Sequence, residues 1–443
     1  MKGNIIFWAI VSALAGFLFG FDTVVISGAE KTIQDLWKLS PTVHGIVMAA
    51  ALYGTVIGAI FGGIPANRLG RRKTLICIGA LYFVSAVWSA FATGVCTLTL
   101  ARFLGGLGIG ISTVAAPLYI SEIAPPKHRG VLAGMFQFNI VFGIIVAYLS
   151  NYLFGGIGET AWRWMLGVEA VPALAYWALC FIIPESPRWL ILHGDKAGGM
   201  NVLRMLQPNA SEAEVQGLAD EIESSGHDRK TGNAGSILLK KFRVPLLLAF
   251  MIAFFNQLSG INAILYFAPR IFELTGLGTK AALLQSVGIG ITNLVFTFIG
   301  LALIDRLGRK TLLYIGSFGY IIALGLTSWA FASETFNIVP ACIFGFVGAH
   351  ALGQGAVIWV FISEIFPNAQ RAQGQAFGAA THWVFAALLT TVFPFTVARV
   401  APPYIFGFFC FMMALQLLWV FLCVPETKGV PLEQMQKKFG IEQ

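Results

Sequence analysis

Twelve long apolar stretches, separated by short polar segments, dominate the hydrophobic pattern of the chain. Each contains roughly 19–25 residues, which is enough for a helix to cross the ~30 Å hydrocarbon core of a bilayer. A bilayer interior offers no water to backbone amides, so these stretches are predicted to be helices. The predicted spans cover residues 5–26, 43–64, 74–92, 98–120, 130–154, 164–183, 244–268, 281–304, 311–331, 338–362, 376–397 and 403–424.

Composition supports this interpretation. Of the 443 residues, 57% are hydrophobic and only 11% are charged, whereas about a quarter of a soluble domain is charged. The six cysteines lie in or beside apolar spans without paired spacing, so neither a disulfide framework nor a metal site is expected. The predicted fold class is an all-α membrane protein with twelve transmembrane helices.

The distribution of basic residues predicts the orientation. Placing the N-terminus in the cytoplasm leaves only six of the 29 Lys and Arg residues in outer loops, and Arg102 inside a span. The positive-inside rule therefore predicts a multi-pass protein of the cytoplasmic (inner) membrane with both termini cytoplasmic. Topology also explains the net charge of +8, so no nucleic-acid partner is expected. The six outer residues are Lys31, Lys38, Arg163, Arg270, Lys280 and Arg399.

Three motif pairs reveal an internal repeat. Arg68–Arg71 (RLGR) recurs at Arg306–Arg309, Ser121–Ile123 (SEI) at Ser363–Ile365, and Pro184–Ser186 (PES) as Pro425–Thr427 (PET). One nearly constant offset of about 240 residues indicates two homologous six-helix halves, a common plan of secondary transporters. The predicted domains are an N-terminal half (1–184), a cytoplasmic helical linker (185–242), a C-terminal half (243–425) and a cytoplasmic tail (426–443).

The linker predicts short amphipathic helices, such as Ala197–Met205 and Ser211–Glu223. Ser211 and Glu214 have the spacing of a capping box, which marks a helix start. The segment is too short for a catalytic domain and contains no nucleotide or metal motif. A solvated connector between the halves is the better interpretation.

Only three charged residues lie within the predicted spans: Asp22, Arg102 and Glu169. Counted at 1.5 Å per residue, all three lie within ~10 Å of the outer edge of the hydrocarbon core, so they are expected to meet. Burial favours a protonated acid and a neighbouring guanidinium favours an ionised one. This opposition predicts a proton-coupling switch, because ionisable groups inside membranes are usually functional. A static buried ion pair is the alternative.

A second group of polar residues is uncharged. Amides match the hydrogen bonding of hydroxyl groups, and aromatic faces suit the apolar faces of a sugar ring. A single amide more often forms an interhelical hydrogen bond, but several on different helices favour a neutral polyhydroxy ligand. Gln257 and Asn262 lie about 140° apart on an ideal helix, so Gly260 is expected to break it. The candidate binding residues are Gln137, Asn256, Gln257, Asn262, Asn293 and His382, with the aromatics Phe19, Tyr266, Trp359 and Trp383.

A third group, of charged residues, lies at the predicted cytoplasmic ends of the spans. Opposite charges there are expected to form a gate by bridging the two halves. Because a single exposed ion pair is weak, only a network of such pairs would hold the gate closed. The alternative is that the basic members only set topology. The predicted gate comprises Arg71, Glu122, Arg129, Glu185 and Arg188 in the first half, and Arg309, Glu364, Arg371 and Glu426 in the second.

These motifs resemble the sugar porter family of the major facilitator superfamily. The similarity rests on Arg68–Lys73 (RLGRRK), Asp305–Lys310, Pro184–Arg188 (PESPR), Gln257–Asn262 (QLSGIN) and Pro425–Gly429 (PETKG), in order along the chain. It implies an alternating-access transporter that binds a monosaccharide between its halves through the candidate residues above. It also implies proton coupling, because Asp22 and Arg102 match the coupling pair of the bacterial symporters, with Glu169 nearby.

The resemblance leaves the sugar open, because Asn256 stands where Gln is frequent and His382 where Gln or Asn is usual. The predicted function is a symporter of a hexose or pentose, with the proton as coupling ion and the lipid bilayer as its environment. Glucose is the first sugar to test. No cofactor and no enzymatic activity are expected, and a monomer is predicted. The alternatives are a facilitative sugar uniporter and, with a short tail of 426–443, a transporter-like sugar sensor.

Overall fold

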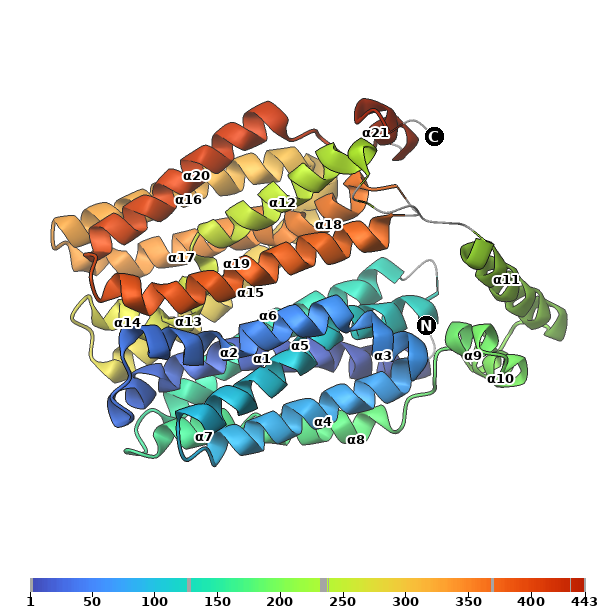
Figure 1. Cartoon of the computed structure of the whole chain (residues 1–443), viewed down its shortest axis with the longest axis horizontal. Helices are drawn as coiled ribbons and strands as arrows, with labels where there is room; N and C mark the ends of the chain where they lie inside the picture. Colours follow the sequence, from blue (N-terminus) through green and yellow to red (C-terminus); the bar gives the residue numbers. More distant parts are fainter. Residues whose placement is uncertain are drawn as a thin grey trace. The chain divides into compact units, whose positions relative to one another are not determined.

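The computed structural model describes residues 3–125, 129–231, 237, 239–367, 370–430 and 432–441. In these ranges every regular element is a helix and no strand occurs (Figure 1). Eleven helical segments in the described part are long and apolar enough to cross a membrane. The predicted all-α membrane fold is thereby confirmed.

The helices of the first sequence half follow the predicted spans, and several extend beyond them. Helix α1, for example, continues ten residues past the predicted end of the first span, to Leu36. The short α3 (Gly63–Arg68) follows α2 directly. The long helices are α1 (Gly3–Leu36), α2 (Pro41–Phe61), α4 (Arg71–Ala90), α5 (Val95–Ile123) and α6 (Arg129–Phe154).

The sixth predicted span is interrupted. It consists of α7 (Ala161–Gly167) and α8 (Ala170–Cys180), with a turn at residues 168–169 between them. Each piece alone is too short to cross a bilayer, so the sixth predicted span is absent from the eleven candidates. The turn places Glu169 between the two helices instead of inside one.

The second sequence half contains more interruptions. The seventh span is divided into α12 (Arg243–Leu258), α13 (Ile261–Tyr266) and α14 (Ala268–Glu273), and the tenth into α17 (Val339–His350), a π-helical turn (Ala351–Gly355) and α18 (Ala356–Ile365). The other helices are α15 (Thr279–Leu307), α16 (Arg309–Ala332), α19 (Arg371–Val397), α20 (Pro402–Cys423) and the terminal α21 (Leu432–Lys438).

The chain forms two compact units. The first contains Met1–Thr23, Gly54–Ile144 and Leu166–Ala234; within it α4 packs along α5 and α8. The second contains Val24–Tyr53, Ile145–Met165 and Gly235–Gln443; within it α16 packs along α17 and α20, and α12 along α19. The later parts of α1 and the early part of α2 therefore belong to the second unit. The domain boundaries inferred from the repeat stay a prediction.

Three linker helices form a small cluster in the first unit: α9 (Pro187–Leu192), α10 (Lys196–Leu206) and α11 (Glu212–Thr231) (Figure 1). They enclose a core of Ile191, Leu203, Val215 and Ala219. The predicted capping box is present, because Ser211 N–H donates to Glu214 and Glu214 N–H donates to the Ser211 hydroxyl. On the surface, a hydrogen bond from Lys196 lowers the pKa of Asp220.

Candidate functional site

In the first unit, α1 and α5 bring a carboxylate and a guanidinium together. Arg102 Nη1 donates to Asp22 Oδ1 at 2.5 Å, and Arg102 Nη2 donates to the Asp22 backbone carbonyl at 2.7 Å. The Asp22 side chain is 1% exposed and that of Arg102 is 2% exposed. The predicted contact between the acid and the base at equal depth is present. A buried pair of this kind costs desolvation energy, which makes it weak evidence of a purely stabilising role.

Glu169 completes this group, which we call the acid triad (Asp22, Arg102 and Glu169). It is 2% exposed and lies close enough to Asp22 and Arg102 to interact with both electrostatically. Asp22 Oδ2 and Glu169 Oε1 are both buried and receive no hydrogen bond in the described structure. Two carboxylates and one guanidinium carry a net charge of −1, so the triad becomes neutral when it holds one proton. Facing carboxyls commonly share a proton in this way.

In the second unit, a break in the seventh span gathers amides. Gly260 adopts a left-handed conformation, with φ +89°, which ends α12 and starts α13 in a new direction. Asn262 Nδ2 then donates to Gln257 Oε1 at 2.6 Å, and Gln257 Nε2 donates to Asn256 Oδ1 at 2.9 Å. The predicted break at Gly260 is confirmed. It removes the 140° separation that an unbroken helix would impose on the two side chains.

His382 and two indoles adjoin the amides. Gln257 Nε2 lies 3.1 Å from His382 Nδ1, and the imidazole ring centre lies 5.2 Å from that of Trp359 and 4.7 Å from that of Trp383. Gln257 and Trp383 are buried, whereas Trp359 is partly exposed. We call Asn256, Gln257, Asn262, Trp359, His382 and Trp383 the amide cluster. It contains hydrogen-bond donors, acceptors and aromatic faces but no formal charge, apart from any proton on His382.

The remaining candidate binding residues lie outside these contacts. Gln137 is partly buried and Phe19 is buried, both in the first unit. In the second unit, Tyr266 is buried and Asn293 Oδ1 accepts a weak hydrogen bond from the Thr297 hydroxyl at 3.4 Å. Their participation in one binding site with the amide cluster stays a prediction. Among the described residues, no cluster of three metal-ligating side chains occurs.

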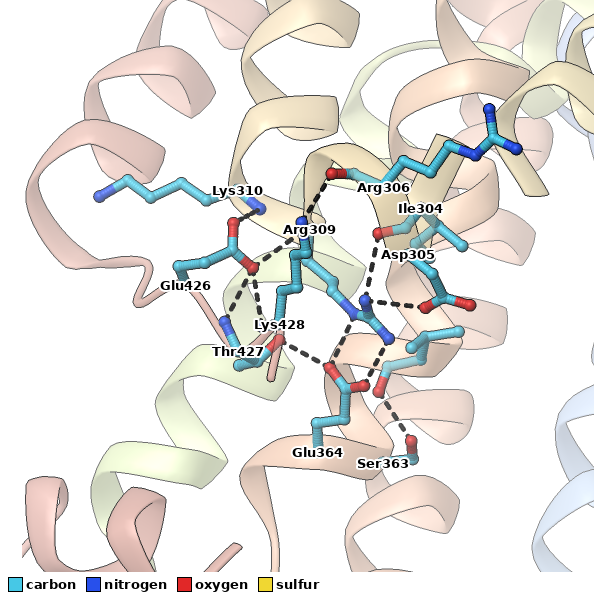
Figure 2. A network of polar contacts seen from close by, with 11 residues as sticks. Ile304, Asp305, Arg306, Arg309, Lys310, Ser363, Glu364, Glu426, Thr427 and Lys428 are labelled. Carbon is cyan, nitrogen blue, oxygen red and sulfur yellow. Dashed lines mark hydrogen bonds and ion pairs between the residues drawn. The ribbon is translucent and has the colours of Figure 1, made fainter. Parts of the chain in front are cut away.

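The predicted gate residues form two similar clusters, one in each repeat. In the first, the Arg71 guanidinium donates to both oxygens of Glu122, at 2.9 and 2.8 Å. In the second, Arg309 binds Glu364 in the same bidentate way, at 3.0 and 2.7 Å (Figure 2). Both arginines thus pair within their own repeat, whereas the sequence had suggested partners in the opposite half. Bridging between the halves stays a prediction.

Glu185 and Glu426 are equivalent members of the two clusters. Glu185 accepts hydrogen bonds from the backbone N–H groups of Arg71, Arg72 and Ser186, and Glu426 accepts them from those of Arg309, Lys310, Thr427 and Lys428 (Figure 2). Each acid caps a helix N-terminus, where free N–H groups and the helix dipole favour a carboxylate. The hydrogen bonds described for both acids come from backbone amides.

The remaining predicted gate residues are Arg129, Arg188 and Arg371. Arg188 lies in α9 and Arg371 begins α19. The side chain of Arg129 lies outside the described residues.

One buried charged group was not predicted from the sequence. Glu30, near the end of α1, contacts His44 at the start of α2 at 2.8 Å and Arg270 on α14 at 3.2 Å. Glu30 lies four residues beyond the predicted end of the first span, so a search limited to charges inside spans excluded it. A longer estimate of the first helix, with the lone histidine of the second span as a signal, could have identified this group.

Similarity to known proteins agrees with this geometry. Residues 8–439 match the sequence model of the family described as Sugar (and other) transporter. The chain is 35% identical over 447 residues to the arabinose-proton symporter of Bacillus subtilis (strain 168), covering 98% of this chain and 95% of the relative. It is 33% identical over 466 residues to the D-xylose-proton symporter of Escherichia coli (strain K12), covering 96% of this chain and 94% of the relative.

A further relative is the galactose-proton symporter of Escherichia coli (strain K12). It is 35% identical over 445 residues, which cover 98% of this chain and 94% of the relative. The fold matches a structure described as the partially occluded inward open conformation of the xylose transporter XylE from E. coli, with a TM-score of 0.86 and 31% identity, over 97% of this chain and 100% of that one. The family and these relatives are transporters, not enzymes. The chain therefore belongs to the sugar transporter family, with the membrane fold of the major facilitator superfamily.

Proposed function

We propose that this protein is a proton-coupled symporter of a neutral monosaccharide. The observation that supports it most directly is the buried contact of Asp22 with Arg102, with a second buried acid, Glu169, close enough to interact with both electrostatically. Together these groups can hold one proton. Loss or gain of that proton changes the net charge of a buried group by one unit, which is expensive in a membrane interior. Proton binding can therefore be coupled to a conformational change.

The amide cluster supports a sugar as the other substrate. Its amides and imidazole match hydroxyl groups, and its indoles match the apolar faces of a pyranose or furanose ring. The relatives are named for arabinose, xylose and galactose, so the substrate class we assign is a pentose or hexose. Gln137, Phe19, Tyr266 and Asn293 belong to the same proposed site.

The proposed mechanism is alternating access. In it, a protonated acid triad releases Arg102, which favours sugar binding from outside and permits the turn inward. The protein lies in the cytoplasmic membrane as a monomer, with both termini in the cytoplasm, as the distribution of basic residues supports. The helix ends that carry the Arg71 and Arg309 clusters form the proposed cytoplasmic gate.

Proteoliposomes containing the full chain test the proposal. Adding a transported sugar should draw protons into the vesicles, measured with a pH-sensitive dye, and an uncoupler should abolish sugar accumulation. Asp22→Asn should eliminate sugar-driven proton movement while sugar exchange across the membrane persists. Accumulation that survives the uncoupler, or proton movement that survives Asp22→Asn, would contradict the coupling assignment.

A facilitative uniporter is the second candidate, because the short and doubly hydrogen-bonded Asp22–Arg102 contact could also be a static ion pair. A uniporter would equilibrate sugar without proton uptake. Competition of unlabelled pentoses and hexoses with labelled glucose at two pH values would identify the preferred sugar.

A further inference from the structure

The second unit contains a histidine that the proposed binding site does not yet use. His350 is the last residue of α17, directly before the π-helical turn, and it lies midway along the tenth span, which runs from Phe336 to Ile365. A hydrogen bond of 2.6 Å joins His350 Nδ1 to the hydroxyl of Tyr320 on α16. Tyr320 is fully buried, whereas His350 is partly exposed. A polar side chain at this depth faces the interior of a helix bundle and is a candidate for function.

Tyr320 also links His350 to the break between α12 and α13. Ser259, at that break, donates to the Asn256 carbonyl at 2.6 Å and accepts from the Ile261 N–H at 3.3 Å. The Ser259 hydroxyl lies close enough to the Tyr320 hydroxyl to interact with it. Tyr320 therefore lies between the imidazole and the turn that gathers the amide cluster.

His350 adjoins the amide cluster by two further routes. The imidazoles of His350 and His382 are close enough to interact electrostatically. The π-helical turn that follows His350 contacts α12, the helix that carries Asn256 and Gln257. His350 thus lies beside the residues that we assign to the sugar, on a helix that already contributes Trp359 through its continuation α18.

The second ring nitrogen of His350, Nε2, is left without a hydrogen bond from the described residues. Gly355 leaves the adjoining space open, because a Cβ there would lie 3.6 Å from Nε2. In a neutral imidazole one nitrogen donates and the other accepts, and the Tyr320 hydroxyl can meet Nδ1 in either case. Nε2 therefore offers one donor or one acceptor, and a sugar hydroxyl can meet both kinds.

We propose that His350 is a further residue of the sugar-binding site, whose Nε2 forms a hydrogen bond with one sugar hydroxyl, and that Tyr320 is its positioning residue. The Tyr320 hydroxyl fixes the rotation of the imidazole, so that Nε2 points in one direction before the sugar arrives. A site that forms a hydrogen bond with a particular hydroxyl rejects the analogue that lacks it. This inference deepens the proposed function and rests on it, because it assumes a monosaccharide at the amide cluster.

Competition by deoxy sugars in proteoliposomes containing the full chain tests this inference. The labelled parent sugar is the one of glucose, xylose, arabinose and galactose that the wild type takes up fastest. Each monodeoxy analogue lacks one hydroxyl, and the ratio of its apparent dissociation constant to that of the parent measures what that hydroxyl contributes. In His350→Phe, the ratio for one analogue should fall by about 2- to 12-fold, the range of one neutral hydrogen bond. The ratios for the other analogues should not change.

His350→Asn is a second variant in case His350→Phe does not fold. Its amide can still bind the Tyr320 hydroxyl, because it reaches the position of Nδ1, but nothing occupies the position of Nε2. The ratio for the same analogue should therefore fall in His350→Asn as well. A residue with only a structural role would instead weaken the parent and all analogues alike, which leaves every ratio unchanged.

Tyr320→Phe tests the positioning role, because it removes only the hydroxyl that orients the imidazole. The ratio for the same analogue should fall, since a freely rotating ring presents Nε2 less often. Tyr314→Phe is the matched control on the same helix; the Tyr314 ring centre lies 5.9 Å from the Lys310 ammonium. This control should keep all wild-type ratios.

The inference and the proposed function fail in different ways. Ratios that are the same in the wild type and in the His350 variants, or that all change together, overturn His350 as a sugar contact. A wild-type ratio for the same analogue in Tyr320→Phe overturns the positioning role. Uptake of none of the four sugars overturns the proposed function and this inference with it, whereas absence of sugar-driven proton uptake overturns only the coupling.

Discussion

The first and seventh spans occupy equivalent positions in the two repeats, and they differ at the same short motif. Gly20-Phe21-Asp22 in the first recurs as Gly260-Ile261-Asn262 in the seventh, at the repeat offset of about 240 residues. In the first span, α1 continues unbroken through Gly20. In the seventh, Gly260 turns to φ +89° and the helix breaks. The equivalent glycines thus differ: Gly20 stays within a continuous helix, whereas Gly260 redirects the chain.

The chemistry of the two repeats differs in the same way. Asp22 is an acid that binds Arg102, whereas Asn262 is its neutral isostere and binds Gln257. At the repeat offset from Arg102 and Glu169 stand Cys342 and Cys410, which are uncharged. The first repeat therefore concentrates buried charge, and the second concentrates neutral hydrogen-bonding groups. We infer that duplication allowed one half to specialise in the proton and the other in the sugar.

The largest expected effect comes from transferring a second-repeat residue into the first. Arg102→Cys leaves Asp22 and Glu169 without a cation, and removing one partner of a buried pair typically costs about 3–5 kcal/mol. We expect a much lower melting temperature in detergent, partly restored in acid because protonation neutralises the acids. A melting temperature equal to that of the wild type would show that the guanidinium does not compensate the two acids.

The matched control completes the transfer. The triple variant Asp22→Asn/Arg102→Cys/Glu169→Cys carries all three second-repeat residues and no buried charge. It should melt well above Arg102→Cys alone and should lack sugar-driven proton uptake. A triple variant as unstable as the single one would mean that packing, not charge, explains the loss.

The next effect concerns the helix break. Gly260→Ala forces a side chain into a left-handed conformation, at a cost of about 1–2 kcal/mol, and places Cβ 2.7 Å from the Phe409 ring. The amides should separate, so sugar binding measured by tryptophan fluorescence should weaken by about tenfold or more, which is 1.4 kcal/mol. Gly276→Ala is the control: its φ is +86° and its Cβ would meet nothing within 4 Å. It should lower stability without changing sugar affinity.

A smaller effect is expected at His382. His382→Ala removes a neutral hydrogen bond with Gln257, worth about 0.5–1.5 kcal/mol, so sugar affinity should fall by about 2- to 12-fold. The ratio of protons to sugars transported should stay unchanged, because the proposed site of the coupling proton lies in the first repeat. A changed ratio in flux measurements would place a transported proton in the second repeat and weaken the division of labour.

The parts of the site that could be predicted from the sequence are those that follow from helix geometry or from the cost of burying a charge. The meeting of Asp22 with Arg102 was predictable, because a buried charge needs a partner and the lipid leaves few choices. The break at Gly260 was predictable from the angle between Gln257 and Asn262. These inferences needed only helix geometry and the cost of burial.

Other features depended on contacts that charge patterns do not reveal. Glu185 and Glu426 were expected to belong to a charge network between the halves, and their binding of helix N-termini was not anticipated, because N–H groups carry no mark in the sequence. The interruption of the sixth span at Glu169 was not anticipated, because hydropathy is continuous across it. The buried group of Glu30, His44 and Arg270 was missed because hydropathy ends the first span at residue 26, whereas the helix continues to Leu36.

The smallest expected effect compares the Arg71 and Arg309 clusters. Arg309 pairs with Asp305 at 3.1 Å (Figure 2). The equivalent contact of Arg71, with the uncharged Asn67, is longer at 3.5 Å. Asn67→Asp should strengthen the first cluster and Asp305→Asn should weaken the second, each by no more than about 0.5 kcal/mol, because Asp305 is 82% exposed. Melting temperatures at low and high salt would detect the change, since salt should diminish it. A shift of several kcal/mol in either variant would mean that the aspartate also contacts a partner outside its own repeat, as expected of a gate.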